Sequence, residues 1–330
     1  MQRAAPIEAS WNPFRCAGAG LAAEVLLALK LASLLVLVGA WPPGPNLIIE
    51  GLLFGAGVAL WLNRRVRSSA FLFGAALLVQ SLQAGVRSET VAVAVAFLAA
   101  SLLRERRAAM LGLVVGLGYL LYAMRTVTLG VAPTLLVAGL LVGVGLCVPQ
   151  TRTVAVWLGL IWHAGALGIG WLTAPALALV GLYPLLFTWP RRMEVFYDGD
   201  CGFCEATRGR FEKLDLDGVY DWKPFQSGGW EAYGITEDAL LEKLHVVASG
   251  RVTAGFAAFK TMLFYNPLSY LLTAFALVAL LLIDARAAAV ASACLLLFLS
   301  PLFAPIGEAG YAWIARNRHR LPGDQVCKVR

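Results

Sequence analysis

Two cysteines three positions apart stand out as residues that could do chemistry, in the stretch M-E-V-F-Y-D-G-D-C-G-F-C-E. Cys201 and Cys204 form a C-x-x-C pair, and Asp198 and Asp200 precede it. Two thiols at this spacing can exchange a disulfide with a partner or bind a soft metal ion. Three other cysteines lie in or beside apolar runs, where packing is the expected role: Cys16, Cys147 and Cys294.

The residues around the pair predict a strand, a turn and the start of a helix. M-E-V-F-Y is β-rich, D-G-D is typical of a turn, and the helix begins at Cys201. Unpaired N–H groups and the helix dipole stabilise a thiolate at that position. Cys204 lies one turn later on the same side and can resolve a mixed disulfide. We therefore expect Cys201 to attack, because it is the outermost residue of the helix, and Cys204 to close the disulfide.

The aspartates are expected to shape the loop and to tune the pKa of the thiols. Two carboxylates beside Cys201 disfavour its thiolate and oppose the helix dipole. Nearby cations would offset this effect, and the basic segment A-R-N-R-H-R supplies them. We therefore expect Arg316 or Arg318 to lie close to Asp198 and Asp200.

The sequence that follows predicts a small α/β domain over residues 193–262. G-V-Y-D-W-K-P-F is typical of a second strand, and residues 236–243 of a short helix opened by Thr236. Two further strands form a hairpin that turns at Ser249 and Gly250. The order β-α-β-α-β-β is that of a thioredoxin-like fold.

The composition of the whole chain indicates a membrane protein. Of the 330 residues, 59% are hydrophobic and 14% are charged, whereas soluble domains average about 45–50% and 25%. Of the 20 acidic residues, 12 lie between 194 and 242. The sequence therefore predicts a mainly α-helical integral membrane protein that carries one inserted soluble domain, the thioredoxin-like domain.

Apolar runs predict about ten transmembrane helices, since a span needs roughly 17–25 residues. They lie at 20–40, 47–62, 68–86, 90–103, 108–124, 131–148, 154–172, 174–189, 267–283 and 287–303. The predicted organisation is an N-terminal membrane domain of about eight helices (1–192), the soluble domain (193–262), two further transmembrane helices (263–306), and a basic amphipathic tail that closes the soluble domain (307–330).

The positive charges predict the orientation of these spans. Lys and Arg occur in short clusters between apolar runs, a pattern typical of membrane topology rather than of nucleic-acid binding. With ten spans the clusters share one side of the membrane, which makes the soluble domain and both termini cytoplasmic. A cytoplasmic C-x-x-C pair favours a cycling disulfide or a metal site over a structural disulfide.

Polar residues inside apolar runs are candidates for a site within the membrane. Lys30 and His163 lie near the middle of their runs. Each could contact a ligand or cofactor, and a quinone is one candidate. The alternative for each is an interhelical hydrogen bond.

The stretch Y-D-G-D-C-G-F-C resembles the DCC family of thiol-disulfide oxidoreductases. The similarity extends through W-K-P-F-Q-S, H-V-V-A-S-G-R-V-T-A-G-F-A-A-F and Y-A-W-I-A-R-N-R-H-R-L-P-G to Cys327. The resemblance implies a thioredoxin-like domain with Cys201 and Cys204 as the redox pair, and Cys327 is a candidate third thiol. This chain departs from the pattern in two places: residues 267–303 are apolar enough for two spans, and Lys243-Leu244-His245 replaces the proline usual before the third strand in thioredoxins.

The N-terminal part is similar, more weakly, to vitamin K-dependent γ-carboxylase-like membrane domains, the HTTM type. The similar residues are an early F-R, W-H-A-G-A-L-G-I-G-W-L, and Y-P-L-L-F-T-W-P before the soluble domain. The sequence shows no soluble carboxylase-type domain, so we do not infer carboxylase activity from this resemblance.

Three other interpretations use the same residues. A strand followed by a D-x-D motif, here Asp198 and Asp200, is also typical of a haloacid dehalogenase phosphotransferase. That enzyme would need a larger domain and a further acidic pair for magnesium. A metal-binding or metal-transporting membrane protein would use Cys201 and Cys204 as soft ligands and recruit Cys327, His319 or an aspartate. An inert C-x-x-C on a membrane scaffold is the third interpretation.

The redox interpretation needs no metal and no cofactor other than the disulfide itself. It implies a lipid bilayer and a protein or small-molecule thiol or disulfide as partners, and no nucleic acid.

Overall fold

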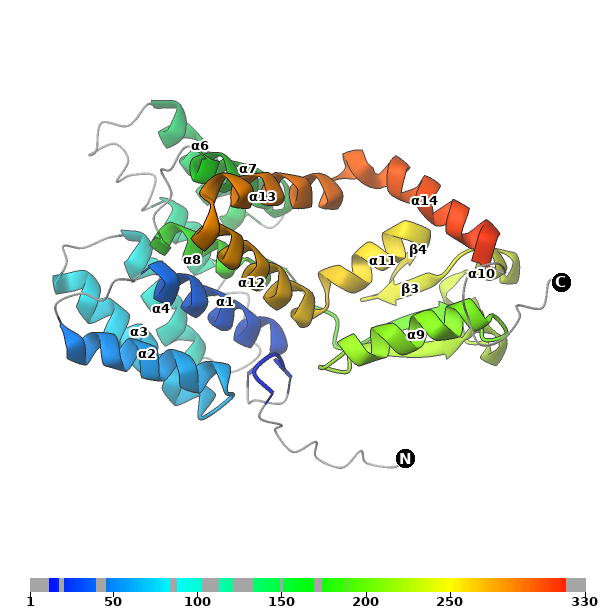
Figure 1. Cartoon of the computed structure of the whole chain (residues 1–330), viewed down its shortest axis with the longest axis horizontal. Coiled ribbons are helices and arrows are strands. Elements are labelled where there is room, and N and C mark those ends of the chain that lie inside the picture. Colours follow the sequence, from blue (N-terminus) through cyan, green and yellow to red (C-terminus); the bar gives the residue numbers. More distant parts are fainter. Residues whose placement is uncertain are drawn as a thin grey trace. The chain divides into compact units, whose positions relative to one another are not determined.

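The chain folds into helices and one small sheet, which Figure 1 shows for a computed structural model. The structure describes residues 12–17, 21–39, 46–83, 88–102, 113–120, 133–148, 151–168, 174–187 and 189–318. It divides into two compact units. The first comprises Met1–Thr188 and Thr273–Ala293, and the second Trp189–Leu272 and Cys294–Arg330.

The first unit is helical, and each predicted apolar run of the N-terminal part contains helix. Its elements are α1 (Ala23–Gly39), α2 (Leu47–Trp61), α3 (Val66–Gln83), α4 (Ser88–Leu102), α6 (Pro133–Cys147), α7 (Arg152–Gly168), α8 (Ala174–Gly181) and the 3-10 helix η2 (Tyr183–Leu186). Residues 113–120 are also helical. Helices α12 (Pro267–Ile283) and α13 (Ala285–Leu299) contribute residues to both units.

Small residues let the helices of this unit approach closely. A Cβ on Gly74 of α3 would lie only 2.9 Å from the carbonyl oxygen of Ala94 and from Cβ of Phe97, both in α4. The rings of Phe73 and Phe97 stack beside this contact with centroids 4.6 Å apart. Glycine at a helix contact is typical of packing within membranes, where close backbone approach supplies the van der Waals energy.

Most of the described helices are shorter than the predicted spans, whereas α12 has the same bounds as its span and α4 is no shorter than its span. None of the described helices alone has the length and apolarity to cross a membrane, although two bent pairs do when joined. One pair is Gly255–Phe264 with Pro267–Ile283, bent by 76°, and the other is Ala285–Leu299 with Pro301–Asn317, bent by 68°. The ten-span arrangement therefore stays a prediction.

The second unit contains the sheet in the predicted order of elements. These are β1 (Met193–Tyr197), α9 (Gly202–Leu214), β2 (Tyr220–Pro224), α10 (Glu237–Glu242), β3 (His245–Ala248) and β4 (Arg251–Ala254). The strand order is β2-β1-β3-β4, with β1 parallel to β2 and antiparallel to β3, and β4 antiparallel to β3. The unit also contains α11 (Gly255–Phe264), α14 (Ala304–Asn317) and the 3-10 helices η3 (Phe225–Ser227), η4 (Glu231–Tyr233) and η5 (Pro301–Phe303).

Side chains that alternate along β1 contribute to two separate cores. Met193 and Val195 belong to one core, together with Phe211 of α9 and Met262 of α11. Phe196 belongs to the other core. The remaining buried residues of that second core come from segments that follow β2 and from β3: Phe225, Ile235, Leu240 and Val247. The sheet therefore has apolar packing on both faces, which holds the end of β1 in a fixed position.

Local sequence signals account for the turns of this unit. Ser249 and Gly250 both have positive φ, 50° and 78°, as the two-residue turn of a hairpin requires. The Thr236 hydroxyl accepts a hydrogen bond from the amide of Ala239 and caps α10. The predicted hairpin and the predicted helix cap are both confirmed.

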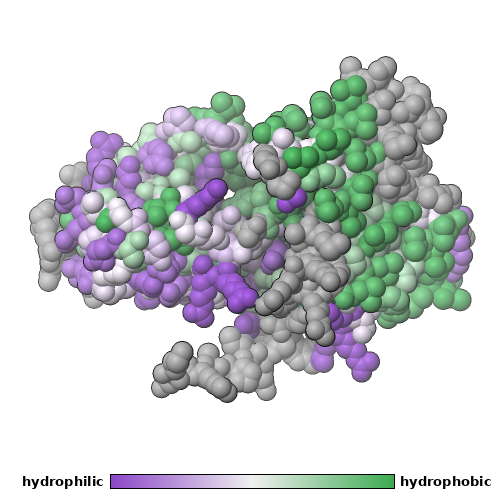
Figure 2. Space-filling view, turned by 180° about the vertical axis from the view of Figure 1, so that it is seen from behind, coloured by the Kyte–Doolittle hydropathy of each residue, from purple (hydrophilic) through white to green (hydrophobic). Residues whose placement is uncertain are grey.

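The two units differ in surface character. On the face that Figure 2 shows, hydrophobic residues dominate the coloured surface of the helical unit and hydrophilic residues that of the unit with the sheet. In the helical unit, Leu47 and Ile48 are 76% and 77% exposed. The acidic residues of the second unit and the outward apolar side chains of the first follow from the uneven composition of the chain.

Candidate functional site

Cys201 lies where β1 gives way to α9. It is the N-cap residue of that helix, with extended backbone angles (φ −101°, ψ 110°), and its carbonyl accepts the amide of Glu205. The amide of Cys201 donates to the carbonyl of Asp198, which closes the turn after β1. Cys204 follows in the first turn of α9. The structure therefore places the C-x-x-C pair at a helix N-terminus, as the motif predicts.

The two cysteines differ in exposure. Cys201 is 0% exposed, whereas Cys204 is partly exposed. Cys201 is the outermost residue of the helix, as expected, but its side chain is buried. A partner can therefore touch Cys204 in this conformation, and it reaches Cys201 only after neighbouring groups move.

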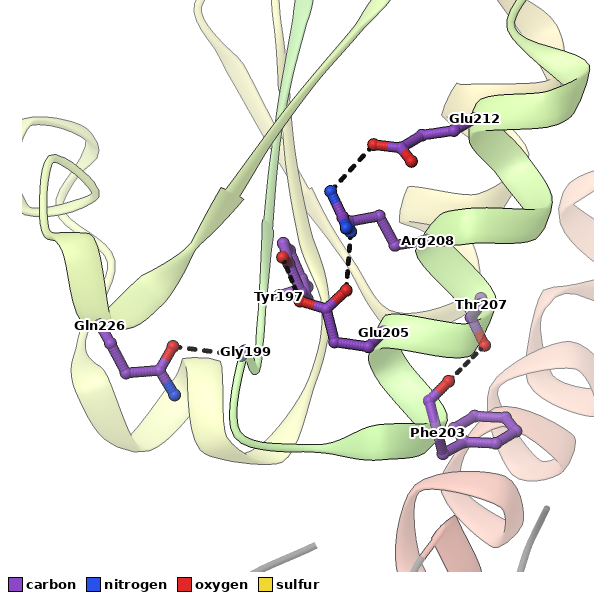
Figure 3. A network of polar contacts seen from close by, with 8 residues as sticks. All are labelled: Tyr197, Gly199, Phe203, Glu205, Thr207, Arg208, Glu212 and Gln226. Atoms are coloured by element: carbon purple, nitrogen blue, oxygen red, sulfur yellow. Dashed lines mark hydrogen bonds and ion pairs between the residues drawn. The ribbon is translucent and has the colours of Figure 1, made fainter. Parts of the chain in front are cut away.

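The loop at residues 198–200, the D-G-D loop, is held by side-chain hydrogen bonds. Asp198 Oδ1 accepts the amide of Asp200 at 3.1 Å and Nε2 of Gln226 at 2.9 Å. Gln226 Oε1 accepts the amide of Gly199 at 3.1 Å (Figure 3). A Cβ on Gly199 would lie 2.8 Å from Cβ of Pro224, so the loop needs glycine there. Asp198 thus shapes the loop.

Arg318 reaches the D-G-D loop from beyond the end of α14. Its Nη2 lies 3.8 Å from Oδ2 of Asp198 and donates to the carbonyl of Leu241 at 2.9 Å. The two oxygens of the Asp198 carboxylate therefore have different partners, the loop on one side and Arg318 on the other. Asp200 is exposed.

The other predicted residues of the C-terminal segment are placed differently. Arg316 is exposed, and its Nε donates to the carbonyl of Ala312 in its own helix. Cys327 and His319 lie outside the described residues. Of the two arginines that the sequence offered, the structure brings Arg318 to the loop.

Tyr311 is a site residue that sequence reasoning missed. Its hydroxyl accepts the amide of Leu244, the residue before β3, at 2.8 Å. Burial raises the pKa of Tyr311 to about 12, and the proximity of Cys204 and Glu308 adds to this effect, whereas the Leu244 amide and Arg318 oppose it. Tyr311 belongs to the stretch Y-A-W-I-A-R-N-R, which is part of the family resemblance, but the sequence assigned Tyr311 no role. Helix α14 therefore reaches the vicinity of Cys204.

Glu308 attaches α14 to the start of α11. Its Oε1 accepts the amide of Ala257 in the first turn of α11 at 3.2 Å. Gly255 begins that helix with φ +59°, and a Cβ there would lie 2.9 Å from Oε2 of Glu308. The carboxylate therefore satisfies an N-terminal amide of α11 and favours the positive end of its dipole.

A second polar network ties β1 to α9 (Figure 3). Tyr197 donates its hydroxyl proton to Oε1 of Glu205 at 2.7 Å, and Arg208 Nε donates to Oε2 at 2.8 Å. Arg208 Nη1 also donates to Glu212 at 3.0 Å. Burial raises the pKa of Tyr197, and the hydrogen bond to Glu205 acts in the same direction. The network fixes the residue directly after Cys204.

Lys30, a predicted candidate for an intramembrane site, binds backbone. It is fully buried, and its Nζ donates to the carbonyl of Pro13 at 2.6 Å and of Arg15 at 2.8 Å. Nδ2 of Asn63 donates to the same Arg15 carbonyl. These bonds attach residues 12–17 to α1 and to the segment that follows α2. They assign Lys30 a structural contact and leave a ligand role as a prediction.

His163, the other candidate, takes part in an interhelical hydrogen-bond chain. Its Nε2 lies 3.1 Å from the hydroxyl of Tyr119, which lies 2.6 Å from the hydroxyl of Tyr183. All three side chains are buried. A Cβ on Gly159 would collide with the Tyr183 hydroxyl, so Gly159 makes room for the chain of contacts. This arrangement is the interhelical hydrogen bond that the sequence left as the alternative.

The described part of the chain contains no cluster of three or more His, Cys, Asp or Glu side chains able to hold a metal ion. The further ligands that the metal interpretation would recruit are Cys327, His319 or an aspartate, and of these Cys327 and His319 lie outside the described residues.

The comparisons with known proteins bear on the second unit. A search of curated proteins found no match, and a search of solved structures found none. A family model matches residues 195–291, a range that includes Cys201, Cys204 and Gln226. It does not extend to the N-terminal helices, where the resemblance to carboxylase-like membrane domains stays a prediction. In residues 195–291 the chain is similar to the DCC1-like thiol-disulfide oxidoreductases, the family that the D-G-D-C-G-F-C motif predicts.

Proposed function

We propose that this protein is a membrane-bound thiol-disulfide oxidoreductase whose redox centre is the pair Cys201 and Cys204. The observation that carries the proposal is the position of Cys201 as N-cap of α9, directly after β1, with Cys204 one turn later. The family match over 195–291 supports thiol redox chemistry for this part of the chain. The partner is a protein or a small molecule that carries a thiol or disulfide.

The proposed reaction is dithiol–disulfide exchange. In the reducing direction, the Cys201 thiolate attacks one sulfur of the partner disulfide, forms a mixed disulfide and releases the other sulfur as a thiolate. Cys204, after losing its proton, attacks Cys201 Sγ and releases the second partner thiolate. Two electrons pass to the partner, and the pair is left as a disulfide that an external dithiol must reduce. The reverse sequence oxidises a partner dithiol.

The arrangement of strands supports a thioredoxin-like assignment for this domain. The sheet order β2-β1-β3-β4, with the C-x-x-C pair at the start of the helix after β1, is the topology expected of that fold. The place before β3 that thioredoxins give to proline is occupied by Leu244, whose amide binds Tyr311. Partner docking at this position would have to accommodate or displace α14.

The membrane part of the proposal is supported by composition and by exposed apolar helices. Leu47 and Ile48 of α2 are largely exposed, as expected for side chains that contact lipid. Leu282 and Ile283 at the end of α12 are 72% and 82% exposed. The basic clusters favour a cytoplasmic location for the redox domain, by which we mean the sheet and its helices in the second unit, with Cys201 and Cys204.

The full chain in lipid nanodiscs provides the test. We expect it to reduce an insulin-type disulfide with dithiothreitol as the source of electrons. Cys201→Ser should abolish turnover, while Cys294→Ser, which removes a thiol outside the motif, should leave turnover unchanged. Unchanged turnover in Cys201→Ser with an intact fold would reject the assignment.

Trapping experiments assign the roles of the two thiols. Cys204→Ser should accumulate a mixed disulfide with the partner at Cys201, because the resolving thiol is absent. Because Cys204 is the more exposed thiol, Cys201→Ser is tested as well, to see whether Cys204 attacks the partner. A stable adduct at Cys204 in Cys201→Ser, with none at Cys201 in Cys204→Ser, would show that Cys204 is the attacking thiol and Cys201 the resolving thiol.

A further inference from the structure

Helix α14 has two faces of opposite chemical character. Its inner face carries Glu308 and Tyr311, which accept backbone amides of the redox domain, and it leads to Arg318. Gly307 also lies on this face, because a Cβ there would collide with the ring of Phe256 in α11. The hydrogen-bonding groups of these side chains are therefore directed toward the domain.

The outer face of α14 and of η5 before it is apolar. Leu302, Ile306 and Trp313 are 79%, 64% and 57% exposed, and Gly310 between them has no atom within 4 Å of a Cβ position. These residues are spaced by four, four and three positions, which places them on one side of a helix. None of the exposed residues in 301–318 is acidic.

This arrangement is the reverse of a helix that covers a water-soluble domain. Such a helix turns its apolar stripe toward the core and its polar residues toward water. In α14 the carboxylate of Glu308 and the hydroxyl of Tyr311 are directed inward, while Ile306 and Trp313 face outward. Leaving three large apolar side chains in water is costly, at roughly 25 cal/mol for each Å² of apolar surface. The outer face is therefore suited to an apolar environment.

Two neighbouring features identify that environment. Directly before η5 in the chain, α13 also exposes an apolar side chain, Leu297, which is 51% exposed two residues before the end of that helix. Arg316 follows Trp313 on the exposed side, next to the end of α14. Tryptophan followed by arginine at the edge of an apolar face is typical of a helix in the membrane interface, where the arginine meets anionic headgroups.

We propose that α14 lies in the interface of an anionic bilayer, with Leu302, Ile306 and Trp313 among the lipids and Arg316 at the headgroups. The inference deepens the proposed membrane location of the redox domain and rests on it. It makes α14 the layer between the lipid surface and the part of the domain that contains Leu244 and the first turn of α11, whose amides donate to Tyr311 and Glu308.

Photo-crosslinking of the full chain in nanodiscs of phosphatidylcholine and phosphatidylglycerol tests this proposal. A benzophenone amino acid replaces Ile306 or Trp313 on the outer face, and Ala315 on the inner side as the matched control. We expect lipid adducts at positions 306 and 313, and adducts with the protein's own redox domain at position 315. Arg316→Gln should lower the share of phosphatidylglycerol among the lipid adducts at position 313.

Three results would overturn the proposal. They are adducts from 306 and 313 to the first unit of the same chain, adducts to a second copy of the chain, and lipid adducts that are equally frequent at 306, 313 and 315. The readout needs no thiol chemistry, so it is repeated in Cys201→Ser. With Cys201 and Cys204 both present, lipid adducts without disulfide turnover would reject only the redox function, whereas turnover without lipid adducts at 306 and 313 would reject only the interfacial helix.

Discussion

Arg318 Nη2 lies 3.8 Å from Asp198 Oδ2, so two residues 120 positions apart in the chain meet beside the redox motif. The same nitrogen donates to the carbonyl of Leu241. The Arg318 and Asp198 side chains are only 24% and 13% exposed. The D-G-D loop is therefore held by a residue that follows the last described helix, and its geometry depends on the placement of α14.

Replacing Arg318 by methionine should loosen the D-G-D loop. The change removes a partly exposed ion pair and a charged hydrogen bond, for which we expect a combined loss of about 1–2 kcal/mol in the free energy of local opening. Amide hydrogen exchange of residues 198–201 should accelerate, and disulfide turnover should change with it. Arg316→Met is the matched control, since Arg316 binds only the backbone of its own helix among the described contacts. Equal protection of the loop in both variants would show that Arg318 does not hold it.

Gly199→Ala should damage the redox site while leaving the domain folded. The new Cβ would lie 2.8 Å from Pro224 and 3.1 Å from Oε1 of Gln226, so the loop must shift away from its hydrogen-bond partners. We expect a loss of disulfide turnover with an unchanged circular-dichroism spectrum. Gly209→Ala in α9 meets no atom within 4 Å and should stabilise that helix by about 0.5–1 kcal/mol. Turnover at the normal rate in Gly199→Ala would show that catalysis does not need this loop geometry.

Local patterns predicted the order of elements in the second unit but not all of its helices. Three local features could be predicted from the sequence because they depend on neighbouring residues: the alternating apolar residues, the Thr236 cap and the Ser249-Gly250 turn. Helix α11 was not predicted, because it starts immediately after β4 at Gly255 without an intervening loop. The positive φ that permits this change of direction is a property of the fold.

The C-x-x-C spacing predicted the position of Cys201 but could not predict its burial. A motif determines where a thiol lies along a helix, whereas exposure depends on what packs over it from elsewhere in the chain. The roles of Gln226 and Tyr311 were missed for the same reason, since each acts on a residue more than 25 positions away. Their stretches were part of the family resemblance, which was the one available signal.

The buried imidazole of His245 should make β3 less stable in acid. Burial lowers the pKa of His245 below its ordinary value, and Nδ1 lies 2.9 Å from the Lys243 carbonyl. The unfolded chain, with an unperturbed pKa of about 6.5, therefore binds a proton more readily than the folded one. The contribution to stability is complete above that pH and is lost as the pH falls from about 6.5 toward the lowered pKa.

Hydrogen exchange of the β3 amides, corrected for intrinsic rates, measures this effect in the full chain. Protection should fall below about pH 6.5 in the native protein. His245→Asn cannot titrate but can still donate to the Lys243 carbonyl, so most of the pH dependence should disappear. A pH dependence that persists in His245→Asn would assign it to another group.

Lys30→Met should loosen the attachment of residues 12–17 to α1. The substitution removes the ammonium that donates to the Pro13 and Arg15 carbonyls. The Arg15 carbonyl keeps Asn63 as a donor, whereas the Pro13 carbonyl loses the ammonium, and a buried acceptor left without a donor costs about 1–3 kcal/mol. Limited proteolysis in nanodiscs should cut this segment faster, while disulfide turnover is retained. Asn63→Ala should show the same effect more weakly, because the neutral amide of Asn63 makes longer hydrogen bonds, 3.1 Å each, to the carbonyls of Asn12 and Arg15. If Lys30→Met instead kept the segment protected and abolished turnover, Lys30 would act on a ligand, as its place in an apolar run first suggested.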